Sequence, residues 1–591
     1  MSNLPGQSKL NPGPGQLQRS QLLSTVFDLP ELTDIIFSHL SKNDLVQWTL
    51  VSKKWCHAVI PYIWSNLSTL NTVQHQRLAK MIINDYQTIT NGQQSILAKY
   101  CPLIRSLRDF REYPYRHREY LLLDFIRLAV EVKESFSSVD GSPLSQAQWT
   151  TIHGSFSHFM MHCTHLNALS LKFIVTHSSA HEAVKVVADS AAQHLRHLSL
   201  DGWIHERAFK YLMTKCLSLE TLVINFTPFS NEKYPWIKPW IVEFNEAGQE
   251  PFPNLRRLIL EHVEDFFQES YTPFWRRCKA VEALELTYGS PGLQDAVTAI
   301  ETFFPNLNTI SFGEDLLCDT MEDANLARVL FASQVGWRSI SIMRYVDFGE
   351  QSWKALSQHA STLENFTIMR WPHPEKFKPR PFFTSFPRLR SFVTLSEGWI
   401  AKSDIISTDV DEWIHQDPLS GSFTPWLCEI SLTDLRIRIS GIPRPDVICD
   451  DSGQKRQPVV DETYPGEGRM IQHQVYERLS RFVNLEVLWL GHNSCDAFAI
   501  VHSNQYECLE MSLESGLDQL EGLKRLRVLN VSLMATRIGQ SEARWMAEQW
   551  PKLREIHGLE DGDDSRKARK WFTENCPCIA TPSLVRKKWG K

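Results

Sequence analysis

HLRHLSL, residues 194–200, contains the pattern that decides how most of this chain folds. Apolar residues stand at its second, fifth and seventh positions, with variable residues between them. The last two apolar positions alternate with a variable one, as in a β-strand that buries one side and exposes the other. The phrase therefore predicts a short strand with Leu198 buried in a core.

The same phrase returns along the chain at intervals of about 24 to 36 residues, with helix-like stretches between many of the copies. A period of this size is typical of repeats that contain one strand and one helix. A single unit cannot bury its own apolar face, so the units must stack and their strands form one curved parallel sheet. The other copies are PLIRSL (102–107), HLNALSL (165–171), SLETLVI (218–224), NLRRLIL (254–260), AVEALEL (280–286), NLNTISF (306–312), GWRSISI (336–342), TLENFTI (362–368), RLRSFVTL (388–395), WLCEISL (426–432), NLEVLWL (484–490), RLRVLNV (525–531) and KLREIHGL (552–559).

Residues 101–560 resemble a leucine-rich-repeat array in this pattern. The resemblance implies an α/β solenoid: a curved parallel sheet with helices on its convex side. The asparagine or cysteine usual three residues after the last apolar position is found only at Asn493, so an irregular array is expected. Cys163, Cys216 and Cys278 precede their phrases at matching offsets, as in the cysteine-containing repeat subtype, and are interpreted as small buried residues.

The repeat spacing fails over residues 437–475, a polar stretch with several Pro and Gly. It is predicted to be an inserted loop, either disordered or functional, with disorder favoured by the composition. At the chain ends, we predict a disordered N-terminal tail over residues 1–24 and a C-terminal tail over 561–591. Residues 67–100 are predicted to be a helical linker.

The segment DLPELTDIIFSHLSKNDLVQWTLVSKKWCHAVIPYIW, residues 28–64, predicts three short amphipathic helices instead of a repeat. Asp28 and Pro30 suit the start of the first helix, and Ser41 with Asp44 predicts a capping box for the second. So small a unit cannot bury all of its apolar surface. It is therefore predicted to dock on a partner.

Residues 25–66 resemble the F-box, since LP, an Ile/Leu-rich first helix, DL, VSKKW and a closing Trp follow in the family's order and spacing. The resemblance implies binding to a Skp-family linker protein and, through it, to a cullin-RING ubiquitin ligase. The linker-binding residues carried over from the family motif are Leu29, Pro30, Ile35, Ile36, Leu40, Leu45, Val51, Ser52 and Trp55.

The variable positions of the strand phrases are predicted to line the concave face of the array and to bind a target protein. Trp489 is predicted to be exposed in an otherwise polar row, where it would serve as an anchor. A plain solvated sheet face is the alternative interpretation. The predicted target-binding residues are Arg257, Glu261, Glu285, Trp489 and Asn530.

Composition indicates a folded protein: 42% of the 591 residues are hydrophobic, 22% are charged, and the net charge is −6. Nothing in this balance predicts binding to nucleic acid. No apolar run of about eighteen residues and no secretory signal occur, and twelve cysteines are too few for a disulfide scaffold. We therefore expect an intracellular protein, in the cytoplasm or nucleus, that is neither secreted nor membrane-bound.

No constellation for catalysis or metal binding stands out. His158, His162 and His165 lack a further ligand on their helix face, and Asp409 with Asp411 is interpreted as loop chemistry. We predict no catalytic residues, no metal and no cofactor, and hence no enzyme. The predicted function is a substrate-recognition subunit of a Skp–cullin–F-box E3 ubiquitin ligase. The alternatives are a Skp-bound adaptor or scaffold outside ubiquitination, or an enzyme whose site is assembled from distant repeat loops.

Overall fold

The computed structural model of this chain divides it into two compact units, Met1–Asn231 and Glu232–Lys591, each described by itself below. The structure describes residues 35–37, 39–51, 53–65, 67, 72–95, 97–107, 154–155, 157–173, 178–202, 206–225, 251–261, 272–287, 293–313, 321–370, 378–394, 407–416, 423–442, 448–449, 455–456, 465–491, 508–532, 534, 536–559 and 563–582.

Unit 1 begins with helices and continues as a parallel sheet. Its strands pair in chain order, β1 with β2, β2 with β3 and β3 with β4. Its elements are α3 (Lys42–Thr49), α4 (Lys53–Ser65), α5 (Thr72–Thr90), the short 3-10 helices η2 (Leu97–Lys99) and η3 (Cys101–Leu103), β1 (Ser106–Leu107), β2 (Ala168–Phe173), α8 (Ser178–Ser190), β3 (His197–Gly202), α9 (Glu206–Lys215) and β4 (Thr221–Asn225).

Unit 2 contains a longer parallel sheet, in the order β5-β6-β7-β8-β9-β10-β12-β16-β17-β18. These strands are β5 (Arg257–Glu261), β6 (Ala283–Thr287), β7 (Thr309–Phe312), β8 (Ser339–Tyr345), β9 (Asn365–Arg370), β10 (Ser391–Val393), β12 (Asp434–Arg436), β16 (Val487–Trp489), β17 (Val528–Asn530) and β18 (Glu555–His557). Two small sheets accompany it: β11 (Ser407–Asp409) with β13 (Arg438–Ser440), and β14 (Ile448–Cys449) with β15 (Lys455–Arg456).

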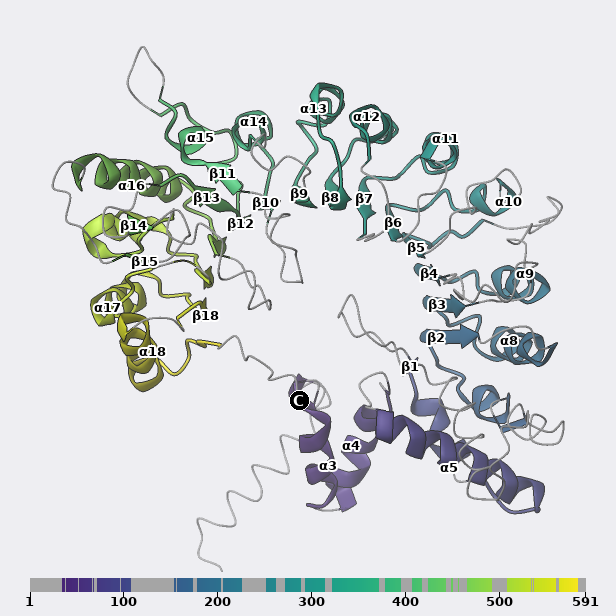
Figure 1. The fold of residues 1–591 in the computed structure, drawn as a ribbon. Helices are drawn as coiled ribbons and strands as arrows, with labels where there is room; N and C mark the ends of the chain where they lie inside the picture. The colour runs from purple at the N-terminus through teal and green to yellow at the C-terminus, as the bar shows by residue number, and fades with distance from the viewer. Residues whose placement is uncertain are drawn as a thin grey trace, which may run out of the picture. The chain divides into compact units, whose positions relative to one another are not determined.

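The helices of unit 2 lie on the outer side of this curved sheet and the strands on its inner side (Figure 1). They are α10 (Thr272–Trp275), α11 (Leu293–Phe303), α12 (Asp323–Phe331), α13 (Glu350–Ser357), α14 (Arg380–Ser385), α15 (Val410–Ile414), α16 (Pro465–Ser480), η8 (Leu513–Ser515), η9 (Leu517–Gly522), α17 (Gln540–Gln549) and α18 (Asp563–Asn575). The predicted α/β solenoid, with a parallel sheet and helices on the convex side, is confirmed.

The apolar positions of the phrases form the core between strands and helices. Leu255, Leu258 and Leu260 of one copy are fully buried, and Leu198 of another is nearly so. Cys163, Cys216 and Cys278 are also fully buried, each three residues before the first apolar position of its phrase, as predicted. Burial raises the pKa of the Cys216 thiol to about 12, so this group is an inert core residue.

One predicted strand is wrong. WLCEISL (426–432) is a turn, and the strand of this repeat is β12, so the phrase is SLTDLRI (431–437), with Leu432, Leu435 and Ile437 fully buried. Trp426 instead packs on the ring of Phe383, at 4.6 Å between centroids. Both segments show similar apolar spacing, and only the turn through Cys428, Ser431 and Leu432 fixes the register.

A buried arginine fastens the unusually long repeat around α15. The guanidinium of Arg478, on α16, donates to the backbone oxygens of Trp413 and Thr424 at 3.3 and 2.8 Å. It also lies 4.4 Å from the ring centroids of Phe423 and Trp426. Burial, followed by repulsion from Arg481, lowers the pKa of Arg478 to about 10. This side chain therefore joins α16 to the segment that contains α15 and Thr424.

Regular elements also lie inside stretches predicted as loop or tail. Within 437–475, β13, β14 and β15 form and α16 begins at Pro465, so the last part of that stretch is helix. Within 561–591, α18 buries Ala568 and Phe572, and Ala580 forms a parallel bridge with Glu555 of β18. The predicted linker 67–100 contains α5. The N-terminal tail, 1–24, lies outside the described residues.

Candidate protein-docking surfaces

The helices α3 and α4 pack around a small core. Phe37, Leu45 and Val59 are buried there, and the partly buried side chains against them are Ile36, Leu40, Trp48, Ala58, Tyr62 and Ile63. The predicted capping box forms: Ser41 Oγ accepts from Asp44 N, and Asp44 Oδ2 accepts from Ser41 N, both at 3.3 Å. α4 continues past Pro61 to Ser65. We call residues 35–65 the helical module.

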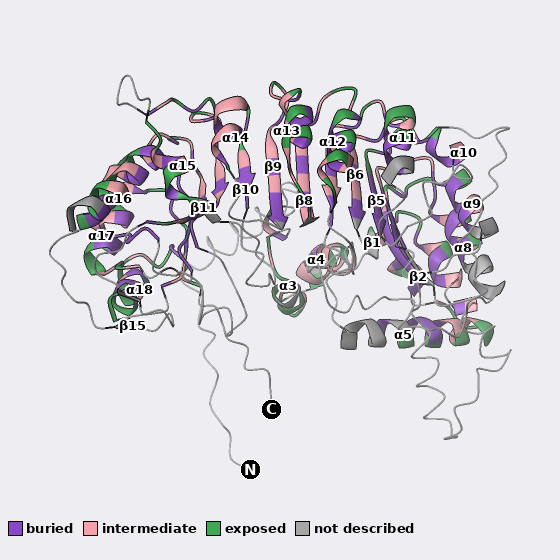
Figure 2. Ribbon diagram, turned by 45° about the horizontal axis from the view of Figure 1, so that its top comes forward, coloured by how far each residue is buried: buried purple, intermediate pink, exposed green. Residues whose placement is uncertain are grey.

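Several large apolar side chains of this module face outward. Leu50 is 77% exposed, Val51 is 64% exposed and Ile35 is 56% exposed, and Val46 is exposed as well. Val46 and Leu50 are four residues apart, so they lie on one face of α3 and its C-cap. Figure 2 shows α3 coloured mainly as exposed. Together these side chains form what we call the apolar face of the module.

The predicted linker-binding residues divide between this face and the core beneath it. Ile35 and Val51 belong to the apolar face, whereas Leu45 is core; Ile36, Leu40 and Trp55 are half-buried. Leu29, Pro30 and Ser52 lie outside the described residues. Val46, Leu50 and the core residue Phe37 were not predicted, although the i, i+4 spacing of Val46 and Leu50 was a usable signal. The role of all these residues in linker binding stays a prediction.

On the sheet of unit 2, two predicted target-binding residues are paired with each other. Arg257 of β5 and Glu285 of β6 form an ion pair at 2.8 Å, and neither side chain is buried. They sit two positions apart in the register, which pairs Arg257 with Ala283 and Ile259 with Glu285, so both side chains are on the same face of the sheet. This pair gives one end of the strand face a solvent-accessible charged contact.

The other three predicted target-binding residues are buried. Trp489 is only 4% exposed, so its prediction as an exposed anchor is wrong. The reason is a long neighbour in the next strand: the guanidinium of Arg436, in register on β12, lies 4.4 Å from the ring centroid of Trp489. Asn530 is fully buried, and its Oδ1 accepts from Ser532 N at 2.9 Å. Glu261 is buried because β5 is covered on both sides from Leu258 to its end.

Between these ends, the strand face is lined by small uncharged polar residues. Two rows cross β7, β8, β9 and, for the first row, β10 in register. Their side chains are half-buried, and none is large. A partner could approach the strands closely here. The residues are Thr309, Ser339, Asn365 and Ser391 in one row and Ser311, Ser341 and Thr367 in the other.

Ion pairs join several neighbouring repeats at the residue after the first apolar position of the phrase, and we call this series the ladder. In unit 2, Arg256 pairs with Glu282 at 2.9 Å, and Glu364 pairs with Arg338 at 3.1 Å and with Arg390 at 3.9 Å. Unit 1 contains the same arrangement in Arg196 with Glu220 at 3.2 Å. These exposed pairs each contribute about 0–1 kcal/mol, so they adjust the charge of this edge more than its stability.

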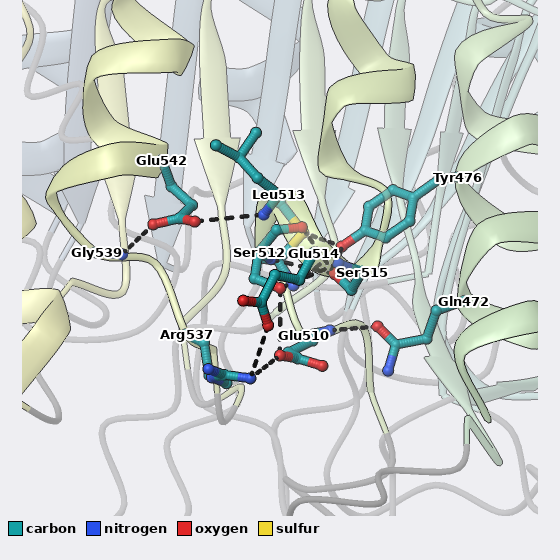
Figure 3. Close-up of polar contacts among 11 residues, drawn as sticks. Gln472, Tyr476, Glu510, Ser512, Leu513, Glu514, Ser515, Arg537, Gly539 and Glu542 are labelled. Atoms are coloured by element: carbon teal, nitrogen blue, oxygen red, sulfur yellow. Dashed lines mark hydrogen bonds and ion pairs between the residues drawn. The ribbon is translucent and has the colours of Figure 1, made fainter. Parts of the chain in front are cut away.

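A largely buried polar network lies around η8, ahead of β17 (Figure 3). Tyr476 Oη accepts from Met511 N at 2.9 Å, and Gln472 Oε1 accepts from Glu510 N at 3.1 Å. Met511 has a left-handed φ of 56°, the only such non-glycine residue in the described part of the chain. Arg537 closes the network through Glu510 at 2.6 Å. These contacts hold the turn before η8 in place, and we assign no chemistry to them.

The histidines and aspartates to which the sequence analysis assigned no metal or catalytic site make local structural contacts. His162 Nδ1 lies 2.8 Å from His158 O, and burial, followed by the neighbouring His162, lowers the pKa of His158. Asp409 caps α15, accepting from Asp411 N at 3.0 Å. Within the described residues, no group of three or more His, Cys, Asp or Glu side chains is placed to hold a metal ion.

Comparison with known proteins gives little. No protein-family model matches this chain, and no curated protein matches it. One similar solved structure is described as "Crystal structure of Rad7 and Elc1 complex in yeast", with 12% sequence identity and a TM-score of 0.35 over 80% of this chain and 99% of that chain. At that identity and TM-score, the likeness supports no statement about the partners or activity of this chain. Among the described helices, none is both long and apolar enough to span a bilayer.

Proposed function

We propose that this chain is a substrate-recognition subunit of a Skp–cullin–F-box E3 ubiquitin ligase. The helical module binds a Skp-family linker protein, and the strand face of the repeats binds a target protein. The chain performs no bond chemistry and uses no cofactor; it holds the target near a ubiquitin-charged enzyme and so raises their effective concentration. Two features support the proposal: the F-box-like motif of residues 25–66 and the apolar face of the module.

The apolar face is the observation that carries the proposal. Fully burying a Leu or Val side chain is worth about 1.5–3 kcal/mol, and Leu50 and Val51 remain mostly exposed. Several large exposed apolar side chains in so short a segment are typical of a protein-docking site. The module's own core of Phe37, Leu45 and Val59 is too small to cover them.

The strand face suits the second half of the proposal. Its strands are fixed by parallel pairing from β5 to β18, and a preformed surface binds with a small ordering cost. Arg257 and Glu285 supply charge at one end, and the small polar rows on β7 to β9 supply hydrogen-bonding groups. The identity of the target does not follow from these groups.

The test is binding of the purified chain to a Skp-family linker, measured by calorimetry. Leu50→Glu and Val51→Glu each place a charge in the apolar face and are expected to weaken binding at least about tenfold. Gln47→Glu, at an exposed polar position of the same helix, is the matched control and is expected to bind normally. Leu29→Ala with Pro30→Ala, in the family motif, should also abolish binding. Equal affinity for all variants would exclude the F-box role.

A Skp-bound adaptor or scaffold outside ubiquitination is the alternative function. An adaptor of this kind would bind the linker through the same surface but would not recruit cullin. Co-purification of cullin with the linker-bound chain, together with target ubiquitination in a reconstituted assay, supports the ligase subunit. Linker binding without recruitment of cullin supports the adaptor. Turnover of a small-molecule substrate by the purified chain alone, lost on a point substitution, would instead support an enzyme.

A further inference from the structure

The last two repeats of unit 2 carry four exposed basic side chains where the chain turns into β17 and β18. Arg525 and Arg527 flank the buried Leu526 in one repeat, and Lys552 and Arg554 flank the buried Leu553 in the next. We call these four residues the C-terminal basic patch. A fifth cation, Lys524, is adjacent and donates to the backbone oxygen and the side-chain oxygen of Gln549, both at 3.1 Å.

The patch is a two-by-two array because the repeats are in register. β17 and β18 pair in parallel with Val528 opposite Glu555, and Arg554 N donates to Arg527 O at 2.8 Å. Arg527 and Arg554 therefore occupy equivalent positions in adjacent repeats, whose backbones are about 4.8 Å apart. Arg525 and Lys552 are equivalent in the same way. Positively charged side chains of two neighbouring repeats thus project from the same edge of the array.

Elsewhere on this edge of unit 2, glutamates pair with the arginines of the ladder, whereas in the patch only Arg527 has such a partner. Arg256 has Glu282, Arg338 has Glu364 and Arg527 has Glu486 at 3.6 Å, whereas Arg554 follows with no acid in its ladder position. Glu555 is next to the patch, but its carboxylate lies 3.3 Å from His557 Nε2. Within the described residues, Arg525, Lys552 and Arg554 form no side-chain hydrogen bond or ion pair. These three cations are thus uncompensated, and the fourth, Arg527, is paired with Glu486, in a chain whose net charge is −6.

An exposed array of four cations, three of them without an ion pair, attracts clustered anionic groups, since binding relieves the repulsion and adds charge-assisted hydrogen bonds. Its size favours protein over nucleic acid. A DNA-binding protein that makes about 6–10 phosphate contacts neutralises more charge than this patch can, since the patch offers four cations bordered by Glu486 and Glu555. Arginine also matches the planar geometry of carboxylate and phosphate groups.

We propose that the C-terminal basic patch binds a short anionic segment of a partner protein, carrying clustered carboxylates or phosphates. In the ligase described above, that segment belongs to the target, and the patch adds an electrostatic contact beside the strand face. Binding of the segment needs only this patch, so it is independent of the linker interface. Failure of this proposal therefore leaves linker binding by the helical module unaffected, and the reverse also holds.

The test measures fluorescence anisotropy with the full chain and four labelled probes. The probes are an Asp/Glu-rich peptide, the same peptide with phosphoserines in place of acids, its Gln/Asn version, and a short oligonucleotide of equal charge. The patch variant is Arg525→Glu with Lys552→Glu. The control is Arg388→Glu, because Arg388 is exposed and occupies in the β10 repeat the position that Arg525 occupies in the β17 repeat. It is compared with each single patch substitution, so that one cation is replaced by one acid in every variant.

We expect at least one anionic peptide to bind, and the double variant to weaken it about tenfold or more at low salt, less at high salt. Each single patch substitution should weaken binding more than Arg388→Glu, which should change it less than about twofold. Preference for the carboxylate or the phosphate peptide identifies the source of the anion. The proposal is overturned if neither peptide binds, if Arg388→Glu acts as strongly as the patch variants, or if the oligonucleotide binds more tightly than both peptides.

Discussion

The helical module and the sheet of unit 2 use the same apolar residue types in opposite ways. In the sheet, Leu258 and Ile340 are fully buried because each repeat covers its neighbour. In the module, Leu50 and Val51 are mostly exposed, because a core built on Phe37, Leu45 and Val59 has nothing large enough to cover them. An apolar residue in this chain is therefore structural or available for recognition according to whether a stacked neighbour exists.

Trp489 is the strongest test of that comparison, since the sequence predicted an exposed binding residue and the structure shows a buried one. Trp489→Ala should lower the free energy of unfolding by about 3–5 kcal/mol in denaturant titration. Trp489→Phe is the matched variant: it keeps a ring under Arg436 and removes a buried Nε1–H that has no hydrogen-bond partner. It should cost clearly less. Unchanged stability of the Ala variant would mean that the side chain is exposed after all.

Leu258 and Leu50 test the comparison directly, one residue from each region. Leu258→Ala leaves a cavity and should lower the free energy of unfolding by about 2–5 kcal/mol. Leu50→Ala removes an exposed side chain and should change it by no more than about 0.5 kcal/mol. Both values come from guanidinium unfolding followed by circular dichroism. Similar losses for the two variants would remove the distinction between the regions.

His359 extends the comparison to the helix–strand junctions of the array. Burial lowers the pKa of this histidine, although its Nε2 lies 2.8 Å from Leu330 O. The unfolded chain then binds the proton more readily, so stability should fall as pH drops below about 6.5, by at most about 1.4 kcal/mol per pH unit. His359→Gln should show a shallower pH dependence of unfolding between about pH 7 and 5. An identical pH dependence of unfolding in both proteins would mean that the His359 side chain is not buried in the folded protein.

The sequence was sufficient for features set by local spacing. The phrase predicted the strand at β3 and at most other copies, because a period of two within a longer repeat has no other compact solution. Ser41 with Asp44 predicted its capping box, and the cysteines before the phrases predicted buried junctions. These features depend on residues close together in the chain.

Features set by contacts between distant residues were missed. Trp489 is covered by Arg436, which is more than fifty residues away in sequence. Trp426 was predicted to start a strand phrase, but it packs on the ring of Phe383 instead. Arg478 looks like an ordinary surface arginine of an amphipathic helix until its three carbonyl partners are known. The basic patch was readable in principle, since Arg527 and Arg554 occupy equivalent positions of two consecutive phrases.

Hydrogen–deuterium exchange of the full chain, with and without a Skp-family linker, tests the central claim most directly. If the module is a docking element and the array is already closed, linker binding should slow exchange in α3 and α4 and leave β5 to β18 unchanged, since the strands gain no new cover. Protection that appears in the strands of unit 2, or that is absent from residues 42–65, would contradict the account.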